Sequence, residues 1–176
     1  MRRPTSILAA IAALTPTLSL ASPLAAAGEP AKLPLRIGTI VEGNLFTSGT
    51  VPGKFTLELG AASDAGKLAL KYTNGSVRRT GAGQTFRPGE RTEAFTRKYG
   101  TLVIHSTGRQ FPVGVENPKD PDGDSEVWMG TWSIVRGTGR YAGLKGGGGV
   151  AGIIEISGHG LSLDYFHRYE GFVTRS

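Results

Sequence analysis

The chain has 176 residues, no cysteine and a formal net charge of +6. The lack of cysteine excludes disulfide bonds, thiolate metal sites and cysteine nucleophiles. Its basic residues are scattered, whereas a nucleic-acid binder usually gathers them on one face, so a nucleic-acid partner is not expected. The 27 glycines are about twice the usual share and favour short strands with tight turns over helices.

Residues 1–27 have the pattern of a secretory signal. Arg2 and Arg3 precede an apolar run, and Ala25-Ala26-Ala27 offers small residues for cleavage. The alternative is a retained membrane anchor, but prolines interrupt a run that is shorter than the roughly 20 residues of a span. We therefore expect export to the periplasm or the medium, with a flexible leader over 28–34 and a single domain over 35–176.

Apolar residues in the rest of the chain recur with a period of two, which indicates strands. We expect strands over 36–46, 55–59, 67–72, 91–99, 102–108, 111–115, 127–135, 149–156 and 161–173, with a weak or edge strand over 76–86. Turn residues predict turns at Pro52-Gly53, Asp64-Ala65-Gly66, Asn74-Gly75 and Arg87–Glu90.

This pattern predicts an all-β fold of antiparallel strands, either a barrel or a sandwich. Immunoglobulin-like sandwiches would typically show a Cys-Trp-Cys core, which this chain lacks. The many glycines favour a small closed barrel, because glycine lets strands bend sharply at the corners.

The acidic run after residue 119 is a candidate calcium site. Asp120, Asp122, Asp124 and Glu126 lie within seven residues, and calcium prefers carboxylate oxygens in turns. The position of Gly123 departs from the helix-loop calcium pattern, so a solvated acidic loop is the alternative.

The glycine-rich run that begins at Gly137 does not match a phosphate-binding loop. Its first glycines have the wrong spacing, and Lys145 is followed by glycine instead of serine or threonine. We expect a tight turn in which Tyr141 acts as a plug.

The last strand carries the most informative pattern. Tyr165, His167 and Tyr169 share one face, whereas Asp164, Phe166, Arg168 and Glu170 share the other. Burying the imidazole and two phenols costs less than burying the charged residues. With this face inward, the predicted cavity residues are Leu57, Leu70, Trp132, Tyr165, His167 and Tyr169. A hydrogen-bonded structural histidine is the alternative role for His167.

The run from Gly130 to Gly146, which contains Gly137-Thr138-Gly139-Arg140-Tyr141-Ala142-Gly143, resembles a segment of the allene oxide cyclase and dirigent-like superfamily. Tyr169-Glu170-Gly171-Phe172 is similar to the closing strand of those proteins. The resemblance implies an eight-stranded, calycin-like antiparallel barrel with an apolar cavity, often oligomeric in plants. It carries over no catalytic residue.

The leading hypothesis is a secreted, non-catalytic barrel that binds a small apolar or aromatic molecule, since such barrels are just wide enough for one small ligand. One alternative is a cyclase or isomerase of the superfamily, and another is a calcium-stabilised surface or interaction protein. We expect no cofactor other than calcium, no nucleic acid and no membrane span, and the oligomeric state stays open.

Overall fold

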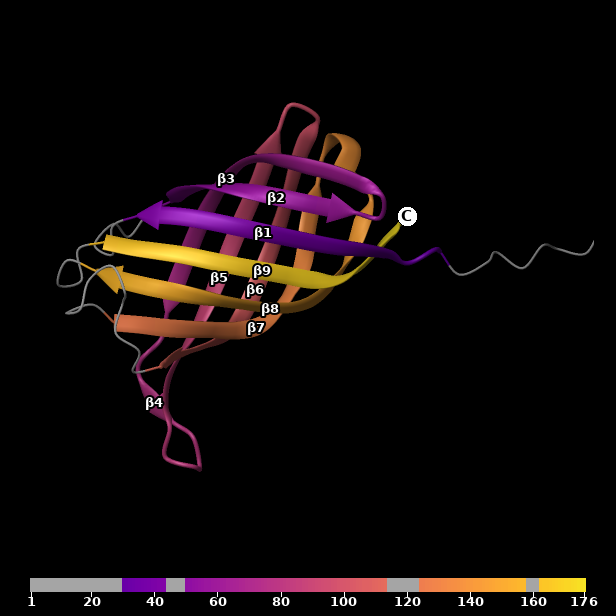
Figure 1. Cartoon of the computed structure of the whole chain (residues 1–176). Coiled ribbons are helices and arrows are strands. Elements are labelled where there is room, and N and C mark those ends of the chain that lie inside the picture. Colours follow the sequence, from indigo (N-terminus) through magenta and orange to yellow (C-terminus); the bar gives the residue numbers. More distant parts are fainter. Residues whose placement is uncertain (1–29, 44–49, 114–123, 158–161) are drawn as a thin grey trace, which may run out of the picture.

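The computed structural model describes residues 30–43, 50–113, 124–157 and 162–176. Long antiparallel strands dominate it and wrap into a barrel (Figure 1). In chain order they are β1 (Leu33–Gly43), β2 (Val51–Leu59), β3 (Ala62–Asn74), β4 (Arg78–Arg79), β5 (Thr85–Arg97), β6 (Gly100–Pro112), β7 (Asp124–Gly137), β8 (Leu144–Ser157) and β9 (Ser162–Arg175).

The strands close into a ring. The order β3-β2-β1-β9-β8-β7-β6-β5 is completed by pairing of β3 with β5, so eight strands form a closed antiparallel barrel. The two-residue strand β4 pairs with the beginning of β5 and lies outside the ring (Figure 1). The predicted fold class is confirmed.

Alternation along each strand separates the core from the outer surface. Leu35, Ile37 and Val41 of β1 are buried, whereas the intervening Arg36 and Ile40 are exposed. Burying one such aliphatic side chain contributes about 1.5–3 kcal/mol. The inward positions of the strands form one continuous apolar cluster inside the barrel.

Three predicted turns are wrong, because Pro52-Gly53, Asp64-Ala65-Gly66 and Arg87–Glu90 lie inside β2, β3 and β5. Their glycines allow close approach between strands. A Cβ at Gly66 would lie 2.6 Å from the Thr96 carbonyl oxygen of the paired strand. The chain turns instead at Gly60, between β2 and β3, where a φ of 59° suits glycine.

The two ends of the barrel differ. The connection from β7 to β8 contains the 3-10 turn η1 (Gly139–Tyr141), and the Tyr141 side chain is fully buried. This confirms the predicted turn with a tyrosine plug. The end of β3 and the beginning of β5 lie at the opposite end of the barrel.

The barrel begins with β1 at Leu33 instead of residue 35. Residues 1–27 lie outside the described part, so the secretory signal stays a prediction. Within the described ranges no helix is long and apolar enough to cross a membrane.

Candidate functional site

The predicted cavity residues all lie inside the barrel. Their side chains are at most 3% exposed, and this holds for Leu57, Leu70, Trp132, Tyr165, His167 and Tyr169. Arg168 and Phe166 point outward from β9. The inward face of the last strand is therefore the one that carries the imidazole and the two phenols.

Aromatic contacts bring four of these six residues together. The His167 ring lies 5.4 Å from the Tyr165 ring and 6.1 Å from the Tyr169 ring. Trp132 packs edge-on against Tyr169 at 6.5 Å. Leu57 and Leu70 belong to the surrounding apolar core.

Gly152 of β8 pairs with His167 and provides the space for its ring. A Cβ at this glycine would lie 2.2 Å from His167 Cδ2. Any larger residue at position 152 would displace the imidazole.

The sequence reasoning missed two charged residues of β5 that face His167. Arg91 is 2% exposed and Glu93 is fully buried. Charged side chains are rarely this buried unless they are paired. Alternation back from Phe95, an apolar residue of the same predicted strand, would have placed both on the inward face. We call Arg91, Glu93 and His167 the interior triad.

The contact between Arg91 and His167 fixes the state of the imidazole. Arg91 Nη1 lies 2.5 Å from His167 Nε2. A guanidinium only donates hydrogen bonds, so Nε2 accepts and the ring proton of neutral His167 lies on Nδ1. Burial lowers the pKa of His167 below its ordinary value of 6.5, which the Glu93 carboxylate opposes and the Arg91 charge reinforces. His167 is therefore neutral near pH 7.

Glu93 lies near the Nδ1 atom of the imidazole, which is also 3.4 Å from Arg91 Nη1. Its Oε1 is 3.7 Å from His167 Nδ1, beyond hydrogen-bond length, and Tyr169 Oη is 3.4 Å from the same nitrogen. Both the His167 imidazole and the Tyr169 hydroxyl interact with the Glu93 carboxylate, but neither carboxylate oxygen has a hydrogen-bond partner of normal length among the described residues. Burial and the nearby Glu93 carboxylate raise the pKa of the Tyr169 phenol well above 10, so this phenol keeps its proton.

Aromatic rings enclose the Arg91 guanidinium. Its Cζ lies 4.0 Å from the Trp128 ring centre and 4.9 Å from that of Tyr165. Such stacking stabilises a desolvated cation by about 2 kcal/mol. Burial nevertheless lowers the pKa of Arg91 from 12.5, and the opposing charge of Glu93 limits the change.

Several buried polar atoms around the interior triad make no hydrogen bond of normal length in the described part of the chain. Besides the Glu93 oxygens they include Arg91 Nε, Ser106 Oγ, Thr39 Oγ1, Gln110 Oε1 and Trp128 Nε1. Leaving one such group without a partner costs about 1–3 kcal/mol. Several buried polar atoms without hydrogen bonds lower the stability of the folded chain, and such clusters are typical of functional sites.

A second buried carboxylate, Asp64, provides a contrast. Its Oδ2 accepts from Tyr141 Oη at 2.6 Å and from Arg140 Nη1 at 3.3 Å. Its Oδ1 accepts from the Ala65 amide at 2.9 Å and from Arg97 Nη1. Burial acts to raise the pKa of Asp64, but these hydrogen bonds outweigh it and hold the pKa below 3.8. This cluster is satisfied and serves the structure.

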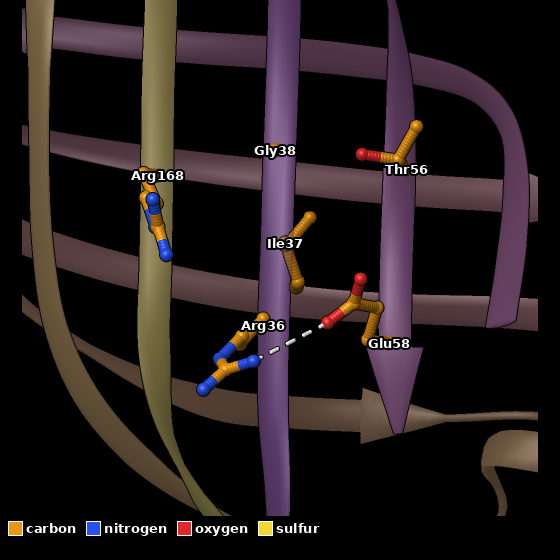
Figure 2. A pocket seen from close by; sticks show the side chains of 6 residues that line it. All are labelled: Arg36, Ile37, Gly38, Thr56, Glu58 and Arg168. Atoms are coloured by element: carbon orange, nitrogen blue, oxygen red, sulfur yellow. Dashed lines mark ion pairs between the residues drawn. The ribbon is translucent and has the colours of Figure 1, made fainter. Parts of the chain in front are cut away.

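The outer surface has a polar hollow of about 360 Å³ over Gly38, shown in Figure 2. Arg36 and Glu58 frame it with an ion pair of 3.7 Å in which both side chains are more than 60% exposed. Arg168 pairs with Glu170 nearby. Exposed ion pairs of this kind contribute little to stability, and each charge already has an opposite charge beside it. The interior triad is therefore the stronger candidate for a functional site.

The predicted calcium site is untested. Asp120, Asp122 and the side chain of Asp124 lie outside the described residues. Glu126 lies on β7, and its Oε2 accepts a hydrogen bond from Gln110 Nε2. Within the described ranges no three histidine or acidic side chains gather as metal ligands.

Comparison of the chain with protein families, with curated proteins and with solved structures finds no match. The resemblance to the allene oxide cyclase and dirigent-like superfamily therefore stays a prediction.

Proposed function

We propose that the chain is an exported barrel that binds a small, largely aromatic molecule in its interior, against the interior triad. The pattern of residues 1–27 supports export. The observation that carries the binding proposal is the buried Glu93 carboxylate, whose two oxygens have no hydrogen-bond partner of normal length among the described residues. A ligand that donates to Glu93 would recover the cost of burying it.

The walls of the site suit an aromatic ligand. Trp128, Tyr72 and Tyr165 lie beside the interior triad, with the Tyr72 and Tyr165 rings 6.0 Å apart. Aromatic rings offer a large contact area and attract other rings by about 0.5–1.5 kcal/mol beyond area burial. Ligand sites typically combine such walls with a few polar groups that fix orientation.

A second proposal is that the barrel is a cyclase or isomerase. It is favoured by the proximity of a neutral imidazole with a lowered pKa, a carboxylate and a protonated phenol. These groups can hold and move a proton at the surface of a folded substrate. In this role Glu93 would accept a proton from the substrate and later return it, while His167 Nδ1–H would donate a hydrogen bond to the oxygen on which negative charge develops.

Native mass spectrometry of the protein purified from its own host tests the binding proposal. We expect an adduct of a few hundred daltons on the wild type and on Glu58→Gln, a matched change on the outer surface. Glu93→Gln, which has the same shape, should lose the adduct. An adduct that persists in Glu93→Gln, or its absence from the wild type, would contradict the proposal.

Turnover separates the two proposals. An enzyme would release product and would lose its rate in His167→Gln, whereas a binding protein would return its ligand unchanged. Incubation of the wild type with the extracted adduct, followed by mass analysis of the recovered molecule, distinguishes them.

A further inference from the structure

A hairpin projects from one end of the barrel (Figure 1). Strand β4 forms one side of this hairpin, and the first residues of β5 form the other. Residues 80–84 join the two sides through a turn in which the Gly83 amide donates to the Thr80 carbonyl oxygen at 2.9 Å. The hairpin extends away from the barrel wall, so it can contact a partner that the rest of the barrel does not touch.

Four arginines that are scattered in the sequence gather on this hairpin and the adjoining strand. Arg78 and Arg79 follow each other on β4, so their side chains extend from opposite faces of the hairpin. Arg87 lies on β5, and Arg109 lies on the neighbouring strand β6. Three of the four side chains are exposed and that of Arg87 is half-buried. The structure therefore concentrates positive charge that the sequence spreads over more than one element.

None of these four arginines has an ion-pair partner among the described residues. Elsewhere on the barrel four other arginines each pair with a carboxylate, namely Arg36, Arg97, Arg140 and Arg168. Neighbouring like charges repel each other, and an anionic partner removes this repulsion. The planar guanidinium binds two oxygens of one phosphate or carboxylate at once. The hairpin is thus suited to a partner that carries such groups.

Apolar side chains lie among these arginines. Val77 is 59% exposed, and Val113, directly after β6, is 40% exposed. The half-buried Phe86 and Phe111 rings are 6.0 Å apart, and the Arg109 guanidinium lies 4.8 Å from the Phe86 ring centre. Basic side chains beside exposed apolar and aromatic ones suit the boundary between headgroups and acyl chains of a lipid bilayer. A nucleic acid would supply phosphates but no apolar layer for the two valines.

A hollow at the base of the hairpin contains one acidic side chain. It has a volume of about 170 Å³, and its lining includes Val77, Arg87, Pro112 and Glu126. Glu126 is half-buried, and its Oε2 accepts a hydrogen bond from Gln110 Nε2. One carboxylate beside four arginines leaves this surface positively charged.

We propose that this surface binds an anionic phospholipid bilayer. We call it the arginine hairpin surface, and it consists of Arg78, Arg79, Arg87, Arg109, Val77 and Val113. The arginines bind lipid phosphate groups, and the two valines lie at the boundary between headgroups and acyl chains. This inference concerns the outside of the molecule and does not depend on the interior triad.

Cosedimentation of the full chain with lipid vesicles tests the proposal. The probes are vesicles of phosphatidylcholine alone and mixed vesicles of phosphatidylcholine and phosphatidylglycerol, which carry a net negative charge. We expect the chain to sediment with the mixed vesicles and to stay in solution with the neutral ones. Added salt should weaken this binding, because ions screen exposed charges.

Two double variants locate the binding surface. Arg78→Gln/Arg79→Gln should lower the affinity for mixed vesicles about thirtyfold, since two basic side chains no longer contribute at the bilayer surface. Lys54→Gln/Lys67→Gln is the matched control, because it removes the same charge from a directly paired, exposed position on β2 and β3. The control should keep the wild-type affinity. Both variants should keep the wild-type free energy of unfolding, because all four side chains are exposed.

Val77→Ser tests the apolar part of the surface. It should retain most of the binding at low salt and lose the part that survives at high salt, because salt does not screen apolar contacts. Unchanged binding of Val77→Ser at high salt would contradict the placement of the valines in the bilayer.

A short DNA duplex at the same salt concentration is the competing probe. Binding to the duplex without binding to mixed vesicles would assign the surface to nucleic acid and overturn the proposal. Equal binding to neutral and mixed vesicles, or no binding to either, would also overturn it. An equal loss of affinity in the lysine control would attribute the binding to net charge instead of the arginine hairpin surface. None of these results bears on the proposed interior ligand.

Discussion

The barrel contains two buried carboxylates in opposite circumstances. Asp64 accepts hydrogen bonds from a tyrosine, two arginines and a backbone amide. Glu93 lies deeper among an arginine, a histidine and aromatic rings, yet neither of its oxygens has a partner of normal length in the described chain. The same chemical group thus holds one end of the barrel together and leaves unused hydrogen-bonding capacity in its interior. Burial alone therefore does not show whether a carboxylate serves structure or binding. The number of hydrogen bonds that the carboxylate accepts from the protein is more informative.

The largest effect on stability is expected from Asp64→Ala. It leaves the buried Tyr141 hydroxyl without its acceptor and removes the ion pairs with the partly exposed Arg97 and Arg140, so we expect a loss of about 1–3 kcal/mol. The free energy of unfolding from urea titration measures this loss. A loss below about 1 kcal/mol would show that the Asp64 cluster does not hold the barrel end.

The double variant Arg91→Met/Glu93→Leu should behave differently. Replacing both members of a buried pair with apolar residues is often neutral or stabilising by about 1–4 kcal/mol. We therefore expect a free energy of unfolding equal to or above that of the wild type, together with loss of the native adduct. A double variant as unstable as Asp64→Ala would instead assign the interior triad to structure.

The smallest effect is a pH dependence from His167. Its folded-state pKa lies below 6.5, so below that pH the unfolded chain binds a proton that the folded chain does not. The free energy of unfolding should therefore fall as the pH drops below 6.5. The groups that face His167 are Arg91 and Glu93 of β5 and Tyr165 and Tyr169 of β9.

Urea titrations at a series of pH values measure this effect. The contribution of Asp64 to the free energy of unfolding does not interfere, because it is lost only as the pH falls below 3.8. His167→Gln should flatten the slope. The control His105→Gln, at a half-buried position on β6, should retain it. An unchanged slope in His167→Gln would show that the imidazole does not stay neutral.

The sequence predicted the barrel because its signals are local. The period of two, the apolar faces and the scattered glycines can be recognised without knowing which strands pair with each other. The same signals identified the inward face of β9. The failed turns share one cause, since a glycine that permits close strand approach, such as Gly66, looks the same in sequence as a glycine that permits a turn.

The candidate site was predicted only in part. Tyr165, His167 and Tyr169 were found because they are neutral and alternate on one strand. Arg91 and Glu93 were missed because charged residues usually face water, and only the pairing around the ring brings β5 to face β9. Their role depends on contacts between residues 76 positions apart, such as Arg91 and His167, which a local pattern does not contain.

The most direct test is a high-resolution crystal structure of the protein purified from its own host, examined beside Glu93. The account predicts density for a bound organic molecule that donates a hydrogen bond to a Glu93 oxygen and lies against Trp128. Glu93 oxygens bonded only to ordered water or to protein donors, with no such density, would contradict the claim that the interior triad is a ligand site.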